Sequence, residues 1–187
     1  TTSPPLQSSL NSLNRNGQDE QEGDLIMGTE KLAVLVNTFG SSLMTVSKEV
    51  GVEVTLVKSE IAQGVNVTGS CVAALIGIVG GGVQGTAVIM LDRGGFDATV
   101  SAMSGGMITP DTDDPVSMSV IGELANMVSG RALVQAALEG TEVTPPQLIS
   151  GAGIKTIPSQ SPGVRSFTLP FRLSVGGTLF LVLSFHA

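Results

Sequence analysis

The sequence predicts an α/β fold of two layers, in which long helices pack on a sheet of about six strands. Two segments, 30–50 and 115–138, carry apolar residues at helical spacing, and each precedes a series of short β-branched runs. The two series also resemble each other in sequence. A chain of 187 residues is long enough for one such domain with a buried core. We therefore expect two pseudo-symmetric halves, each a helix followed by strands.

The first half is expected to begin with a helix from Glu30 to Val50. Its apolar residues recur every three or four positions, and Gly51 is a plausible stop. A shorter helix is expected between the two halves, near 96–104. Strands are expected between the two helices, near residues 52–57, 71–79 and 85–92.

The second half is expected to begin with a long helix that starts at Asp114 and Pro115. Aspartate is a favoured cap, and proline is tolerated at the first helical position. The apolar pattern continues to Leu138, and Gly140 follows as a stop. Further strands are expected near residues 147–150, 153–157, 166–175 and 178–185.

An internal repeat connects the two halves. Asn37 is followed fourteen residues later by GVEVT, and Asn126 is followed at the same spacing by GTEVT. The segment GTAVIML at 85–91 is echoed by GTLFLVL at 177–183. The repeat places the two halves at roughly 30–92 and 119–187, within one domain that spans 29–187. Residues 1–28 are polar and lack periodicity, so we expect a flexible N-terminal tail or a tag remnant.

Composition excludes several classes of function. The net charge is −7 and no run of Lys or Arg is present, so nucleic acid is not an expected partner. One cysteine, Cys71, and one histidine near the chain end, His186, supply neither a disulfide nor a histidine-based catalytic triad or metal cage. Residues 71–91 carry no charge, but glycines divide them into two strand-like runs, so no membrane helix is expected.

Two other patterns predict no ligand site. Gly80, Gly82 and Gly85 match the dinucleotide-binding spacing, yet a strand follows them where a helix is needed to hold a pyrophosphate. The acidic run 111–114 lacks the spacing of a calcium loop and suits the start of a helix. We therefore expect no metal and no cofactor bound by this chain itself.

The long helix of the second half carries four residues of special interest, Ser119, Glu123, Asn126 and Gly130. They fall within an arc of about 60° on the helix, opposite the apolar stripe formed by Ile121, Leu124, Val128 and Ala132. A solvated surface alone would explain this pattern. However, the repeat aligns Val34 with Glu123 and Asn37 with Asn126. A purely structural polar pair gives no reason for that asymmetry, whereas a site retained in one half does.

The pattern Ser-x3-Glu-x2-Asn within SVIGELANMVSG resembles the signature of the CheC/CheX/FliY family of chemotaxis phosphatases, which has Asp or Ser, three residues, Glu, two residues and Asn. The repeat, the GVQGTAVIML segment and the VTPPQLISG segment extend the resemblance over roughly residues 30–187. One intact motif makes the chain more similar to the CheX type than to CheC. The family also has a downstream proline, for which Pro145 or Pro146 is the candidate at a shorter spacing.

The resemblance implies a hydrolase that removes the aspartyl phosphate of a CheY-like response regulator. In the family, the residue at Glu123 pairs with a receiver lysine, and the residue at Asn126 orients the attacking water. Ser119 and Gly130 are expected to contact the partner. Mg²⁺ is expected in the receiver, and a cytoplasmic homodimer paired through sheet edges is expected. Two alternatives stay open: a binding module of the same fold that docks on a receiver or flagellar switch protein without hydrolysis, and a structural subunit.

Overall fold

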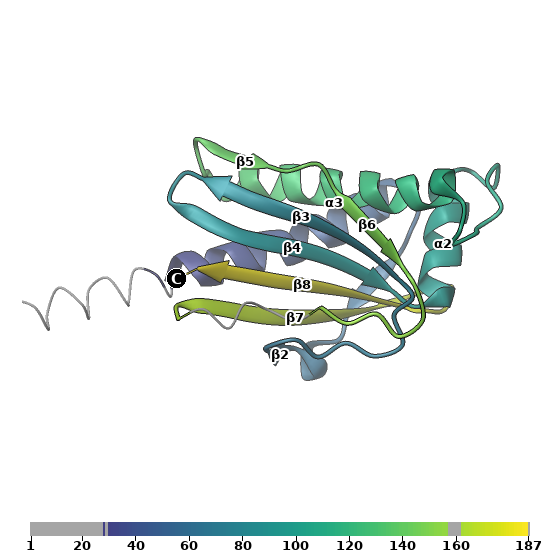
Figure 1. The fold of residues 1–187 in the computed structure, drawn as a ribbon, viewed down its shortest axis with the longest axis horizontal. Coiled ribbons are helices and arrows are strands. Elements are labelled where there is room, and N and C mark those ends of the chain that lie inside the picture. Colours follow the sequence, from purple (N-terminus) through teal and green to yellow (C-terminus); the bar gives the residue numbers. More distant parts are fainter. Residues whose placement is uncertain (1–27, 29, 157–161, 187) are drawn as a thin grey trace, which may run out of the picture.

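The computed structural model describes residues 28, 30–156 and 162–186, and it has the two predicted layers (Figure 1). Three helices cover an antiparallel sheet: a first helix at residues 30–49, α2 at Arg93–Met103 and α3 at Pro115–Gln135. The expected tail lies outside the described residues except for Gly28. None of the described helices is long and apolar enough to cross a membrane, and residues 71–91 mainly form a β-hairpin.

Every strand pairing in the sheet is antiparallel. Among the described residues the sheet has eight strands, against about six expected: six form its main path, and two short strands lie off this path. In spatial order, the main path is β1 (Val54–Leu56), β7 (Val164–Leu173), β8 (Thr178–His186), β4 (Val83–Leu91), β3 (Val72–Gly80) and β5 (Thr141–Val143). The two short strands are β2 (Ala62–Gln63), which pairs with β7, and β6 (Gln147–Ser150), which pairs with β3. A 3₁₀ turn, η1, covers Lys58–Glu60.

The strand order confirms two pseudo-symmetric halves. It reads the same from either end when β1, β3 and β4 are equated with β5, β7 and β8. At the centre of the sheet, Ile89 of β4 pairs with Leu181 of β8, and these two residues occupy the same place in the GTAVIML and GTLFLVL segments. Each half also places its short strand, β1 or β5, beside the hairpin of the other half. The halves therefore exchange edge strands and share one sheet.

The main core lies between the helices and the sheet. All four residues of the predicted apolar stripe on α3 are buried, and Phe39 of the first helix packs against Phe185 of β8 with ring centroids 6.0 Å apart. A smaller cluster on the opposite face of the sheet includes Met90 and Phe180. Apolar burial on both faces accounts for the unbroken apolar runs in the central strands.

Two predicted helix boundaries were wrong. The long helix ends at Gln135 rather than Leu138, because Ala137 adopts a left-handed backbone with φ of 51°. The shorter helix begins at Arg93 rather than Phe96, and the Asp92 carboxylate caps it by accepting a hydrogen bond from the Gly95 amide. The sequence did not indicate this start, because the glycines at 94 and 95 have low helix propensity.

The strand expected at 153–157 is absent as far as Thr156, and Ile157 lies outside the described residues. Gly151 and Gly153 both have positive φ, which breaks the extended conformation that a strand requires. Strands β2 and β5 were not predicted, because runs of two or three residues are too short to show a period.

Candidate functional site

The start of α3 is fixed by Asp114, as the sequence predicted. Its carboxylate accepts hydrogen bonds from the amides of Val116 at 3.1 Å and Ser117 at 2.9 Å, and the Ser117 hydroxyl donates to it as well. The two amide hydrogen bonds are the main reason why the pKa of Asp114 lies below its ordinary value. Proline follows at the first helical position. The register of α3 is therefore set five residues before Ser119.

The structure brings Ser119, Glu123, Asn126 and Gly130 together on the exposed side of α3, facing away from the sheet. The residues between them on the other side are buried against β3 and β4. Neither of the central pair, Glu123 and Asn126, points into the core. Because residues three apart are neighbours on a helix, the carboxylate and the amide can act on one partner together.

The polar groups of Glu123 and Asn126 are unpaired within the part of the chain that the structure describes. Neither the Glu123 carboxylate nor the Asn126 amide has a hydrogen-bond or ion-pair partner there. The Ser119 hydroxyl donates to the Val116 carbonyl at 2.7 Å, so it retains only acceptor capacity. Glu123 also supplies the single charge on this face, because the other charged residue of α3, Arg131, bonds Glu49 of the first helix at 3.0 Å.

Gly122 allows a second segment to approach the site closely. A Cβ atom at this position would lie 3.3 Å from Cγ of Pro146 and 3.2 Å from Cδ2 of Leu148. Pro146 and β6 therefore pack against the turn of α3 that presents Glu123. Pro146, one of the two candidates for the downstream proline, therefore lies against Gly122, the residue that precedes Glu123 in the sequence.

The equivalent face of the first helix is also exposed, with Val34 49% exposed where the other half has Glu123, and with Asn37 beside it. Its surroundings differ. Ala33, the counterpart of Gly122, lines an open groove with Gln63 and Phe167, whereas Gly122 is covered by Pro146 and Leu148. The two halves are therefore unlike both in the acidic residue and in the packing next to it.

The cysteine and the histidine, for which no site was predicted, lie away from this face. Cys71 precedes β3 and is half-buried, and desolvation by burial raises the pKa of its thiol. His186 is exposed at the end of β8. Within the described ranges, no group of three or more His, Cys, Asp or Glu side chains is arranged to hold a metal ion.

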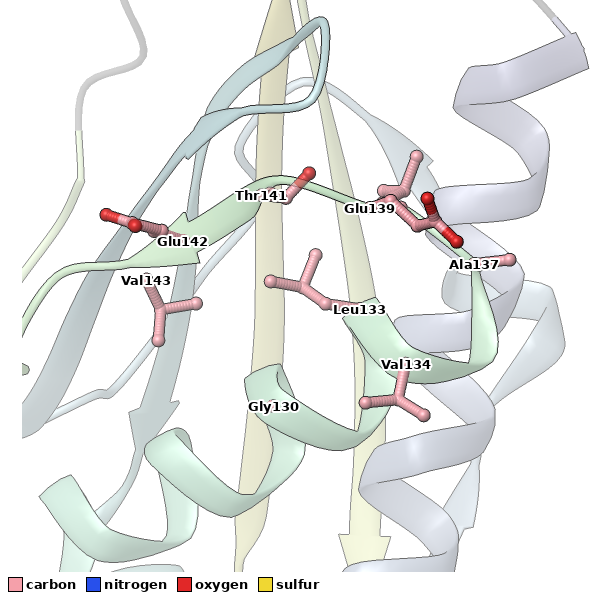
Figure 2. Close-up of a pocket in the computed structure, with 9 residues that line it drawn as sticks. Gly130, Leu133, Val134, Ala137, Glu139, Thr141, Glu142 and Val143 are labelled. Atoms are coloured by element: carbon pink, nitrogen blue, oxygen red, sulfur yellow. The ribbon is translucent and has the colours of Figure 1, made fainter.

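Sequence analysis missed an apolar groove at the C-terminal end of α3, which we name the α3–β5 groove (Figure 2). Gly130 belongs to both the groove and the exposed face. The other lining residues come from the last turns of α3, the loop after it, and β5: Leu133, Val134, Ala137, Leu138, Glu139, Thr141, Glu142 and Val143. The repeat could have predicted β5, one wall of this groove. GTEVT at 140–144 matches GVEVT at 51–55, where a strand was predicted.

Comparison with known proteins identifies relatives of this chain. Residues 72–172 match the family described as Chemotaxis phosphatase CheX. A protein of Thermotoga maritima named CheY-P phosphatase CheX is 32% identical over an alignment 146 residues long, and the match covers 76% of this chain and 87% of that protein.

Solved structures share the fold. The chemotaxis protein CheX from Vibrio vulnificus has a TM-score of 0.66 and 27% identity, with 81% of this chain and 98% of that chain covered. The CheX–CheY–BeF₃–Mg²⁺ complex from Borrelia burgdorferi gives a TM-score of 0.61 at 18% identity, with 81% of this chain and 97% of that chain covered. At the lower identity the likeness concerns the fold alone.

Proposed function

Because this chain belongs to the CheX family of chemotaxis phosphatases, we propose that it removes the aspartyl phosphate of a CheY-like response regulator through the exposed face of α3. The chain is a hydrolase of that class. The observation that supports this use of α3 is the pair Glu123 and Asn126, which lie side by side on its exposed face and have no side-chain partner among the described residues. The catalytic role of this pair is our proposal.

The reaction needs little chemical help from this chain. An acyl phosphate is already activated, so the main task is to hold a water molecule in line with the phosphorus–oxygen bond. The Asn126 amide orients that water through hydrogen bonds, and a neutral amide does so without titrating near neutral pH. The water oxygen bonds to phosphorus, the bond to the aspartyl oxygen breaks, and inorganic phosphate leaves as the receiver carboxylate is regenerated.

The Glu123 carboxylate docks the receiver by pairing with a lysine of its active site. Ser119 and Gly130 contact the receiver on either side of the pair. A Mg²⁺ ion carried by the receiver neutralises charge on the phosphoryl group. The described residues of this chain offer no metal cluster of their own. Catalysis therefore divides between a receiver that holds the phosphate and a helix that positions water.

The proposal is tested by adding the protein to a phosphorylated receiver with Mg²⁺ and measuring the release of phosphate. We expect Asn126→Ala to lower kcat by about a hundredfold, because the water loses its orienting group. The matched control is Asn37→Ala, which removes an exposed asparagine from the equivalent place on the first helix.

Glu123→Ala is expected to raise KM, and Glu53→Ala serves as its exposed control. Tight binding of the phosphorylated receiver without faster phosphate loss would overturn the enzymatic proposal. That result would support the non-catalytic binding module instead.

We further infer a homodimer that pairs through the edges of the sheet, in the cytoplasm. Edge strands present unpaired backbone groups that favour pairing with another strand, and all four residues of β6 are exposed. Light scattering across a range of concentrations tests the dimer, and a monomeric mass throughout would contradict it. Cell fractionation tests the location.

A further inference from the structure

We propose that the α3–β5 groove is a second contact for the phosphorylated receiver, and that it takes an apolar side chain flanked by basic ones. This inference rests on the proposed function, because it extends the face that carries Glu123 and Asn126. It adds a specificity site that the catalytic pair does not require. The partner is therefore defined by its chemistry: a receiver whose surface beside the phosphorylation site is apolar at its centre and positive around it.

The groove continues the proposed catalytic face without a break. Gly130 lies one turn after Asn126 and lines the groove. The groove measures about 770 Å³, which is room for several side chains. In Figure 2, Val143 on β5 faces the last turns of α3, from which Leu133 and Val134 project. A receiver that binds over Asn126 therefore also reaches the near end of the groove, at Gly130.

Two residues of the groove are unusual choices for an exposed stretch of helix. Val134 is apolar and 81% exposed, and it lies on nearly the same side of α3 as Glu123, about 16 Å further along the helix. A Cβ at Gly130 would meet no other described segment within 4 Å, although glycine weakens a helix interior. An apolar side chain left in water and a glycine that leaves open space both suit a surface that another molecule covers.

Charge indicates the nature of that molecule. The charged residues that line the groove are Glu139 and Glu142, both acidic. Because this chain is itself acidic, with a net charge of −7, the surface of a second copy suits these two carboxylates less well than a basic surface does. A partner with Lys or Arg around an apolar side chain is complementary to the groove in both polarity and charge.

The apolar part of the inference is tested with Val134→Ser in the phosphate-release assay. We expect KM for the phosphorylated receiver to rise about tenfold with kcat unchanged, because a valine contact with the bound receiver is lost. Val175→Ser is the matched control, since Val175 is 79% exposed in the turn between β7 and β8. Melting temperatures of the two variants should agree with that of the wild type.

The charged part is tested with the double variant Glu139→Gln and Glu142→Gln. We expect kcat/KM to fall less steeply with added salt than in the wild type, because two attractive charges have been removed. The double variant Glu30→Gln and Glu53→Gln removes the same charge from exposed positions on the other half and should keep the wild-type salt dependence.

The outcomes separate this inference from the proposed function. If the wild-type protein releases phosphate and Val134→Ser leaves KM unchanged, the groove contact is wrong and the phosphatase proposal stands. A wild type that releases no phosphate overturns the proposed function itself. If Val134→Ser alters the mass in light scattering but not KM, the groove binds a second copy and the inference is overturned.

Discussion

At the scale of single residues, Gly130 offers the sharpest separation of stability from function. Gly130→Ala should raise the free energy of unfolding by up to about 1 kcal/mol, because alanine favours a helix and nothing among the described residues lies within 4 Å of the new Cβ. The same change should lower kcat/KM, because the methyl group keeps the receiver at a distance. Urea unfolding and phosphate release measure the two effects. A variant as active as the wild type would show that Gly130 is not a partner contact.

Asp114 gives a pH-dependent prediction. Hydrogen bonds from the Ser117 and Val116 amides lower the pKa of its carboxyl group in the folded state. The resulting stability is therefore present above the ordinary pKa of about 4 and is lost as the pH falls through the lower folded value.

Asp114→Ala should lower the melting temperature by about 5 °C at pH 7 because α3 loses its cap, and the difference should shrink below about pH 4. Asp113→Ala, one residue earlier and outside the cap, is the control. A difference that stays constant down to pH 2 would contradict this role.

The exposure of the four predicted site residues follows from sequence alone, because α3 is regular and a helix has a fixed period. The same period places Val134 on this exposed side, although its residue type favours burial. The groove beside Val134 does not follow from the period, because it depends on where α3 ends and on how far β5 lies from it. Those distances are set by pairing between segments far apart in the chain, which local periodicity does not encode.

At the scale of secondary-structure elements, the contact between α3 and β6 fixes the position of the turn that carries the proposed catalytic pair. Gly122→Val should collide with Pro146 and Leu148 and lower stability by roughly 1–3 kcal/mol. Phosphatase activity should fall too, because a displaced backbone at position 122 also moves Glu123, the next residue.

Leu148→Ala should recover part of the stability lost by Gly122→Val, because it makes room for the new methyl groups. A double-mutant cycle in urea measures this coupling, with Leu148→Ala alone as the reference. Strictly additive changes in the free energy of unfolding would show that α3 and β6 are not coupled through this contact.

The elements themselves were predicted unevenly. Long helices and long strands have clear periods, and the Asp114 cap fixed the start of α3. The short strand β5 exists because β3 supplies its hydrogen-bond partners, for example Val143 opposite Ile78. A segment of three residues has no period of its own, so only the repeat linked it to β1.

At the scale of the whole molecule, the repeat predicted two similar halves but not how they join. The strand order places β1 beside β7 and β5 beside β3, so each half completes the sheet of the other. An antiparallel ladder accepts many partners, and hydrophobic pattern alone does not choose among them. The symmetry nevertheless has a functional consequence, because it places the first helix and α3 at equivalent positions on the sheet, each with one face exposed.

This equivalence predicts that a second working face can be built on the first helix. In an Asn126→Ala background, Val34→Glu together with Ser41→Gly should restore part of the phosphatase activity. The changes reproduce Glu123 and Gly130 beside the natural Asn37, and all three positions are exposed, so folding should be little affected.

The restored rate should stay below that of the wild type. Glu30 stands where α3 has Ser119, and its negative charge opposes a phosphoryl group. Phosphate release measures the rescue, and adding Asn37→Ala should abolish it. A rate that remains at the level of Asn126→Ala would mean that catalysis needs the surroundings unique to α3, namely Pro146 and β6 packed against Gly122.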